Sequence, residues 1–464
     1  MDTRTYIASI KISRPAALRG GHGGAQQKQA AVNRIHAAEG RKMEAVVPRL
    51  EELRASGLIS RFDFIPLTGT VAIDVPESRV REGWQALRAI PQIGRIVRDR
   101  PTGIDDAIDG AEHVRLRPGA ASRPALVAHP PGASDPPAPF AAWPVERVGA
   151  DRAWAAGASG EGVTIGFVDS GVDAAHPLLR AQYRGARPDG STDHSYAFFD
   201  AVNARREAYD DRGHGTMVVG AAVGGTAAQP LGTAPGAKYM VAKVFSAEGK
   251  GSLETTLRGL SWMLEPSDSN GQNPDATKAP DIVSASFGAR DGSSLKYLNA
   301  WKAFDEAGII TVAAAGNGGP RPGTINAPGS YPQSITVGAS TATDQVWAQS
   351  GRGPSPILGP DGKPLAKPDV VAPGVDVPVA FPGGTVAVAN GTSISTPMAA
   401  GVVAILKGRD HSLNAARIKD VLARSSVDLG PAGWDTDSGH GRIDAAAALA
   451  EVNARLAAAT PAAV

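Results

Sequence analysis

From about residue 141, short continuous apolar segments alternate with helical ones, and this alternation constrains the fold more than any other feature. The apolar segments are VTIGFV, KYMVAKVF, DIVSASF, GIITVAAA and SITVGA. Strands that are apolar on both faces must be covered on both faces, as they are in a parallel sheet between two layers of helices. We therefore expect an α/β fold with a mostly parallel sheet, whose functional residues lie beyond the carboxyl ends of the strands.

Helical periodicity marks two of the segments between these strands, SLETTLRGLSWML and SLKYLNAWKAFDEAG. In the second segment, Leu295, Leu298, Trp301 and Phe304 are predicted to form one apolar stripe. The stretch 265–280 is polar and rich in helix breakers, which is typical of a surface insertion.

The first hundred residues follow a different pattern, in the order βαββαβ. Strands are predicted at 5–13, 59–67, 69–76 and 93–100, and helices at 25–56 and 78–90. Gly40 and Pro48 are expected to break or kink the first helix. This order is typical of a small ferredoxin-like α+β unit.

The composition divides the chain into four parts. Residues 1–104 form the ferredoxin-like unit, 105–140 a Pro/Ala-rich linker, 141–452 the larger α/β unit and 453–464 a frayed C-terminal tail. Residues 1–100 hold 17 Lys+Arg and 10 Asp+Glu, a net charge of +7, which leaves −6 on the rest of the chain. A basic first unit therefore faces an acidic second one.

Several classes of site are excluded by composition. The chain has no cysteine, so it has no disulfide, no thiolate metal site and no cysteine nucleophile. The N-terminus lacks the apolar run of a secretory signal, and no apolar run approaches the ~18 residues of a membrane span. The net charge of +1 indicates no polyanionic partner such as nucleic acid.

The stretch NGTSISTP, residues 390–397, offers hydroxyl groups at the start of an apolar helical segment. Taken alone it fits a capped helix start as well as a nucleophile, because Ser and Thr are favoured N-caps. A catalytic serine also needs a base and a group that orients the base. The candidates are His214 in DDRGHGT and Asp169 in VTIGFVDSGVD, although each also fits an ordinary role, Asp169 as a turn residue.

A fourth candidate is Asn317 in TVAAAGNGGP, which follows a predicted buried strand and could equally be a turn asparagine. Together the candidates are far more specific than they are apart. The chain order Asp169, His214, Ser393 on an α/β sheet is one of the known orders of a Ser/His/Asp triad.

The motifs DSGVD, GHGT and GTSISTP also resemble those of the subtilisin-like serine proteases, the subtilases of peptidase family S8. The stretches FFDAVNARREAYDDRGHGT and APDIVSASFG look most like the bacillopeptidase F branch. The resemblance covers roughly residues 141–450. It implies a serine endopeptidase that cleaves peptide bonds through an acyl-enzyme, with Ser393 as nucleophile, His214 as base, Asp169 as its partner and Asn317 as oxyanion donor. Two alternatives stay open: a catalytically impaired subtilase that binds proteins, and an esterase-type hydrolase.

The resemblance also implies residues that bind substrate, each of which could instead be an ordinary core residue. The residues expected along the primary specificity pocket are Ser286, Phe287, Gly288, Ala314, Ala315, Gly316 and Asn326. The residues expected around an apolar pocket further along the substrate are Phe245, Leu253 and Phe287, and Gly251 is also expected to bind substrate.

For cofactors and partners the resemblance gives weaker expectations. No cofactor is expected to be required for catalysis, and no metal ligand is assigned. The stretch GGTAAQPLG after the histidine helix has no carboxylate and does not resemble a calcium loop, so structural calcium is left open only for other parts of the chain. Many subtilases carry a βαββαβ propeptide, so residues 1–104 are expected to be an intramolecular inhibitor of a zymogen, with a basic nucleic-acid binder as the alternative. Secretion or attachment to a bacterial cell envelope is expected from the same resemblance, with the cytoplasm as the alternative, since no signal segment is evident.

Overall fold

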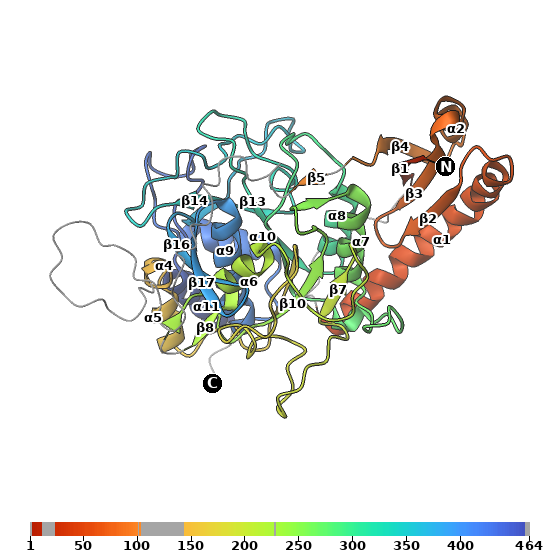
Figure 1. Ribbon diagram of the computed structural model, residues 1–464. Helices are drawn as coiled ribbons and strands as arrows, with labels where there is room; N and C mark the ends of the chain where they lie inside the picture. The colour runs from red at the N-terminus through yellow and green to blue at the C-terminus, as the bar shows by residue number, and fades with distance from the viewer. Residues whose placement is uncertain (1, 12–23, 101, 104–142, 227–228, 460–464) are drawn as a thin grey trace.

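The computed structural model describes all residues except 1, 12–23, 101, 104–142, 227–228 and 460–464 (Figure 1). The predicted linker at 105–140 lies outside the described residues. Two units are visible, a small one at the N-terminus and a large one built on a seven-stranded sheet.

The N-terminal unit has the predicted βαββαβ order. Its elements are β1 (Thr3–Ile10), α1 (Ala25–Ala55), β2 (Arg61–Ile65), β3 (Thr70–Pro76), α2 (Val80–Arg88) and β4 (Ile93–Arg98), with a 3-10 turn η1 (Glu77–Arg79) before α2. The strands form an antiparallel sheet in the order β2-β3-β1-β4. The ferredoxin-like prediction is confirmed.

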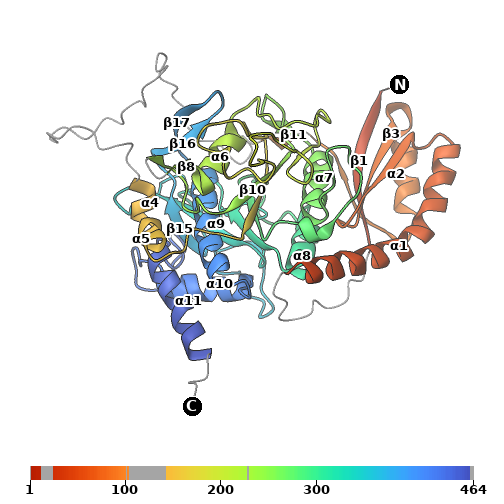
Figure 2. The same ribbon diagram turned by 90° about the horizontal axis from the view of Figure 1, so that it is seen from below.

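We expected Gly40 and Pro48 to break or kink helix α1; neither residue breaks it, and Figure 2 shows that the helix bends along its length. Its two halves are buried in different places. Ala31, Val32 and Ile35 belong to an apolar cluster shared with the large unit, whereas Val46 and Leu50 lie in the core of the N-terminal unit. Burial at both ends compensates for the poor helix propensity of Gly and Pro.

The large unit is built on a wholly parallel sheet in the order β15-β14-β13-β12-β6-β10-β7. Its strands are β6 (Thr164–Asp169), β7 (Phe198–Asp200), β10 (Lys238–Lys243), β12 (Ile282–Ala285), β13 (Ile310–Ala314), β14 (Ile335–Ser340) and β15 (Val370–Pro373). Five of them match the apolar segments identified in the sequence. The α/β prediction is therefore confirmed.

Helices cover both faces of this sheet (Figures 1 and 2). One layer contains α6 (His214–Val223), α9 (Thr392–Arg409) and α11 (Ala445–Ala459), and the other contains α7 (Leu253–Leu264) and α8 (Leu298–Glu306). The remaining helices are α4 (Trp143–Arg147), α5 (Ala150–Ala155) and α10 (Ala415–Ser425), with a 3-10 turn η2 (Ala276–Lys278). None of the helices in the described ranges is long and apolar enough to cross a membrane.

Short strands complete the large unit. A hairpin is formed by β16 (Val377–Phe381) and β17 (Thr385–Ala389), and a smaller one by β8 (Gly225–Thr226) and β9 (Gln229–Pro230). The strand β11 (Lys250–Gly251) pairs in antiparallel fashion with β5 (Thr102–Gly103), the continuation of the N-terminal unit.

Three expectations were wrong in detail. Leu295 is not part of the helical stripe, because α8 begins only at Leu298 and Leu295 is 46% exposed. The stretch 265–280 is not wholly a surface insertion: Ala276 and Ala279 are buried, and η2 packs against α1. The tail expected from residue 453 is helical through Ala459, since α11 packs against α9 and α10.

Trp301 is the centre of an aromatic cluster in the second helical layer. Its ring lies within 6.5 Å, centroid to centroid, of Phe287, Tyr297, Phe304 and Tyr331. We expect Trp301→Ala to lower the free energy of unfolding by about 3–5 kcal/mol, because it leaves a large cavity. Chemical unfolding followed by far-UV circular dichroism measures this change. Leu295→Ala, at the exposed position, is the control and should stay within about 0.5 kcal/mol; equal losses in the two variants would contradict the assignment of this core.

Candidate active site

Asp169, His214 and Ser393 come from three elements that end or begin at the same edge of the sheet. Asp169 is the last residue of β6, His214 the first residue of α6 and Ser393 the second residue of α9. Helices α6 and α9 pack against each other, and α9 also packs against β6. All three side chains are buried.

Asp169 and His214 form a buried hydrogen-bonded pair. The distance from His214 Nδ1 to Asp169 Oδ1 is 2.7 Å, and the backbone N–H of Ser170 donates to the same oxygen at 2.7 Å. Burial would lower the pKa of His214, but the charge and hydrogen bond of Asp169 outweigh it, and the pKa is raised above its ordinary value of 6.5. The pair fixes the proton on Nδ1 and leaves Nε2 as the basic nitrogen. In the structure Nε2 is buried and has no hydrogen-bond partner.

Ser393 lies in the first turn of α9, where backbone N–H groups have no partner within the helix. The turn depends on Gly391, whose φ of 139° is accessible to glycine and strained for other residues. The Ser393 hydroxyl donates to the carbonyl oxygen of Ser286 at 3.3 Å, and the Ser286 hydroxyl donates to the Ser393 carbonyl at 2.8 Å. A rotation about χ1 is therefore needed before the hydroxyl can donate to His214, and such bonds are often absent without substrate.

The amide of Asn317 has a defined orientation. Its Oδ1 accepts hydrogen bonds from the backbone N–H of Thr392 at 3.0 Å and from the Thr392 hydroxyl at 2.8 Å. Because a backbone N–H can only donate, the oxygen faces Thr392 and the NH₂ group points away from it. Asn317 Nδ2 is buried without a partner, beside Gly391. An unpartnered donor next to the start of α9 is suited to hold a negatively charged oxygen.

The structure brings the residues predicted for the primary specificity pocket together. Asn326 donates its backbone N–H to the Ala315 carbonyl at 2.8 Å, and its side chain lies where a Cβ of Gly316 would be. A Cβ on Gly288 would lie 2.7 Å from the Ala327 carbonyl oxygen, next to Asn326. Ala314 ends β13, and Ser286 and Phe287 follow β12.

The residues predicted for the apolar pocket lie together in one cluster. Phe245, Leu253 and Phe287 are buried in it, and the rings of Phe245 and Phe287 are 6.0 Å apart, edge to face. A Cβ on Gly251 would contact the Phe245 ring. Phe287 also contacts the rings of Tyr297 and Trp301, so this cluster is continuous with the aromatic core around Trp301.

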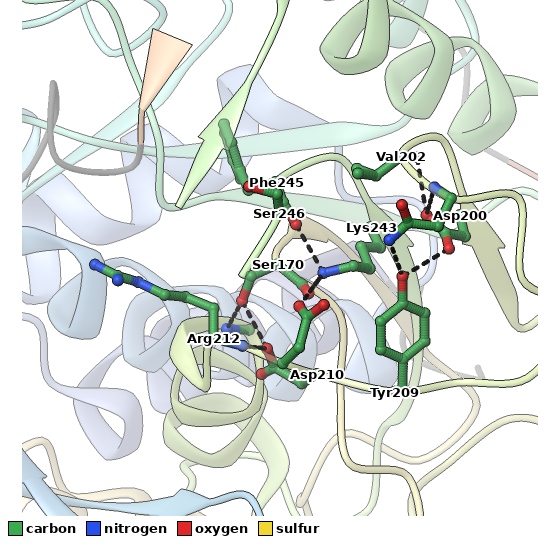
Figure 3. Close-up of polar contacts among 12 residues, drawn as sticks. Ser170, Asp200, Val202, Tyr209, Asp210, Arg212, Lys243, Phe245 and Ser246 are labelled. Carbon is green, nitrogen blue, oxygen red and sulfur yellow. Dashed lines mark hydrogen bonds and ion pairs between the residues drawn. The ribbon is translucent and has the colours of Figure 1, made fainter. Parts of the chain in front are cut away.

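Asp210 and Ser170 have roles at this site that the sequence analysis missed (Figure 3). Asp210 accepts hydrogen bonds from the Ser170 hydroxyl at 2.9 Å and from the backbone N–H groups of Gly213 at 2.7 Å and Thr216 at 2.8 Å. A carboxylate at the start of α6 is stabilised by the helix dipole. The Ser170 hydroxyl accepts in turn from the N–H of Gly215, so the two residues connect the end of β6 with the start of α6. The acidic pair DDR shortly before GHGT is the signal that could have revealed Asp210.

The described ranges contain no group of three or more His, Asp or Glu side chains that could hold a metal ion. The stretch 224–232 after α6 contains no carboxylate in its sequence and does not fit a calcium loop.

Comparisons with known proteins give a consistent result. Residues 160–441 match the Subtilase family. Bacillopeptidase F of Bacillus subtilis (strain 168) is 34% identical over 328 residues, which are 67% of this chain and 22% of that protein. Serine protease AprX of the same organism is 32% identical over 57% of this chain and 61% of its own length, and M-protease of Shouchella clausii (strain KSM-K16) is 32% identical over 62% and 65%. The alignments thus span less than two thirds of each of these relatives. The match to more than half of the chain, over the region that holds Asp169, His214 and Ser393, shows that this protein belongs to the subtilase family.

Proposed function

We propose that the protein is a serine endopeptidase in which Asp169, His214 and Ser393 act as a catalytic triad. The observation that carries this proposal is the buried 2.7 Å hydrogen bond between Asp169 and His214, which leaves Nε2 of His214 unpartnered and basic. Family membership supports the same class of activity.

In the proposed mechanism, the Ser393 hydroxyl rotates away from Ser286 and attacks a peptide carbonyl while Nε2 of His214 takes its proton. Asp169 keeps the imidazole in the required tautomer and stabilises the imidazolium. His214 then protonates the leaving amine, and water hydrolyses the acyl-enzyme by the same steps. The Asn317 amide and the backbone N–H of Ser393 stabilise the oxyanion, and one such donor contributes ~10²–10³ in turnover in subtilisin itself.

No cofactor takes part in this reaction, and bound calcium would be structural. The alternatives, an impaired subtilase that only binds proteins and an esterase, have no observation in their favour. Action outside the cytoplasm is also a proposal; one relative, 28% identical, is named Minor extracellular protease Epr.

For substrates we propose large apolar or uncharged side chains at the cleaved position. Three residues upstream of that position we propose an apolar side chain, because Phe245, Leu253 and Phe287 form one apolar cluster that could bind it.

We further propose that the N-terminal unit inhibits the enzyme. Support comes from the continuation of this unit, in which β5 pairs with β11 in the way a peptide strand adds to a sheet edge. Asp99 Oδ1 accepts a hydrogen bond of 2.7 Å from the backbone N–H of Leu253. Gly251 and Leu253 are both predicted substrate-binding residues, so the chain reaches that region as a substrate would.

Ion pairs between the units agree with their opposite net charges. Three cationic side chains of the N-terminal unit, and His36, pair with carboxylates of the large unit: Lys28 with Asp281 at 2.9 Å, Arg34 with Glu306 at 3.2 Å, Arg61 with Glu254 at 3.3 Å and His36 with Glu265 at 2.8 Å. One pair, between Asp63 and Arg258, has the reverse polarity. Lys28 is the most buried of these cations and also donates to the Ala279 carbonyl.

Replacing the proposed nucleophile tests the mechanism. We expect Ser393→Ala to lower kcat for a chromogenic peptide by roughly 10⁵–10⁶-fold, the scale of a single nucleophile loss in subtilisin, and to abolish labelling by a fluorophosphonate. Ser395→Ala is the matched control, because its hydroxyl donates to the Thr392 carbonyl within the helix at 3.1 Å. It should keep most of the activity. A folded Ser393→Ala protein that still cleaves the peptide would refute the assignment.

The pH dependence follows from the raised pKa of His214, which must be neutral to act as base. We expect kcat/KM to rise with pH through an ionisation above 6.5. The charge of Arg212 lowers the pKa of His214, so Arg212→Gln should move this ionisation to higher pH, and added salt should reduce the difference. Arg187→Gln, which removes an exposed pair with Asp193, is the control and should leave the profile unchanged. A shift to lower pH in Arg212→Gln would contradict the electrostatic account.

Adding residues 1–104 to enzyme that lacks them tests the inhibitor proposal. We expect inhibition at micromolar concentration that weakens with salt, and Lys28→Met should raise the inhibition constant roughly tenfold or more, because it leaves Asp281 without its partner. Arg49→Gln is the control, since Arg49 pairs with Glu52 on the exposed surface of α1. The absence of inhibition at both low and moderate salt would mean that the unit has another task.

A further inference from the structure

A lysine is buried next to the proposed triad, and the proposed mechanism does not use it. Lys243 ends β10, the strand between β6 and β7, and its side chain has no exposed surface. In the sheet register it lies beside Asp169 on one side and Asp200 on the other. In the sequence it is the single charged residue of the apolar run YMVAKVF. An ammonium group is buried at large cost unless it is fully hydrogen-bonded.

Three oxygen atoms surround the ammonium group. Lys243 Nζ donates to the carbonyl of Ser170 at 2.6 Å, to Asp211 Oδ1 at 2.6 Å and to the carbonyl of Phe245 at 2.7 Å. These bonds use all three protons of the group. The Tyr209 ring covers it, with its centroid 4.8 Å from Nζ. Figure 3 shows the side chain reaching between Tyr209 and Ser170.

Each of the three oxygens belongs to a segment that carries part of the site. Ser170 follows Asp169 and donates its backbone N–H to the Asp169 carboxylate. Asp211 precedes His214 by three residues and adjoins Asp210, which binds the start of α6. Phe245 belongs to the predicted apolar pocket, and its backbone follows the strand that pairs with β6. One ammonium group therefore joins the carboxylate segment, the histidine segment and the substrate-pocket segment.

We propose that Lys243 is a positioning residue that sets the geometry of the Asp169–His214 pair. It does not contact the reacting atoms, and it has no proton left to donate to substrate. It acts by fixing the Ser170 carbonyl and Asp211, which hold the end of β6 and the approach to α6 at a set separation. A shift of about 1 Å in such a constellation is enough to reduce a rate by roughly 10²-fold.

The converging geometry explains why the residue is a lysine. Three acceptors within 2.7 Å of a single atom match the point charge and three donors of an ammonium group. The planar fork of an arginine spreads its donors over several atoms and cannot meet all three oxygens. A methionine fills the same volume but leaves two carbonyls and a carboxylate without donors. Charge and size are thus both required.

The test rests on the proposed function and uses the full chain. Truncation in Lys243→Ala removes Cγ, Cδ, Cε and Nζ, which n-propylammonium replaces atom for atom. The side chain of Asp211 is 33% exposed, so a small amine can reach its acceptors. The readout is the second-order rate at which a fluorophosphonate labels Ser393, since the probe needs the triad but no peptide-binding pocket.

We expect Lys243→Ala to be labelled roughly 10²-fold more slowly than the unsubstituted protein. Added n-propylammonium should increase the labelling rate of Lys243→Ala by at least about tenfold, and the increase should saturate with amine concentration. Tetramethylammonium, which has no N–H donor, should leave the rate unchanged. Lys243→Arg should remain slow. With a peptide substrate, the amine should restore kcat.

The matched control is Lys367→Ala. Lys367 is also fully buried, and its Nζ donates to the Ser334 carbonyl at 2.5 Å and to Asp369 at 2.6 Å, at the opposite end of the sheet where β15 begins. Its loss should lower the unfolding temperature without slowing the labelling of folded protein, and amine should have no effect on the rate.

Three results would overturn the proposal: labelling of Lys243→Ala at the normal rate, a slow rate that n-propylammonium leaves unchanged, or equal slowing in Lys367→Ala. If Lys243→Ala does not fold, Lys243→Met, which keeps the apolar stem, carries the same expectation of slow labelling. Failure of both to fold would make the lysine a folding determinant and refute the specific role. Absence of labelling in the unsubstituted protein would instead refute the proposed function.

Discussion

The buried hydrogen bond between Asp169 and His214 is the interaction on which the rest of the site depends. A carboxylate with about 1% exposure is costly unless it is hydrogen-bonded, and here the imidazole and the backbone N–H of Ser170 supply the bonds. The two partners come from different elements, 45 residues apart, so the bond exists only if β6 ends and α6 begins at the same place. The parallel sheet makes this possible, because the carboxyl ends of its strands share one edge.

Charged groups near this edge are arranged so that each buried ion has partners from more than one segment. Asp210 connects the Ser170 hydroxyl with the start of α6, and Lys243 connects Ser170 with Asp211 and Phe245. Removing one member would leave buried groups such as the Lys243 ammonium or the Ser170 carbonyl without a partner, which costs more than losing an exposed pair would. Such a network therefore favours one arrangement of the three segments over alternatives of similar packing.

The N-terminal unit is attached to the large unit by the same combination of apolar burial and ion pairing. Ala31, Val32 and Ile35 of α1 share an apolar cluster with the helices α7 and α8, and cationic side chains around them meet carboxylates. Figure 2 shows α7 and α8 between the sheet and this unit. The uninterrupted course of α1 through Gly40 and Pro48 belongs to this arrangement, because its two halves are held by different cores.

The sequence by itself determined the fold class and the identity of the central residues. Five apolar runs predicted five strands of the parallel sheet, the βαββαβ order predicted the N-terminal unit, and the motifs around Asp169, His214 and Ser393 indicated the family. These features are local: periodicity and motif spacing are written along the chain. The short strands β7 and β15 were not found, because a three- or four-residue strand carries too little periodicity to be recognised. Leu295 was assigned to a helix that begins later, because the pattern continues past the point where packing supports it. Tertiary structure alone decided the orientation of the Asn317 amide, the two contacts of α1, and the environment of Lys243, whose three acceptors lie 2, 32 and 73 residues away in the chain. No local pattern specifies such a set, since it arises only when segments distant in sequence are brought to one point by the packing of the sheet.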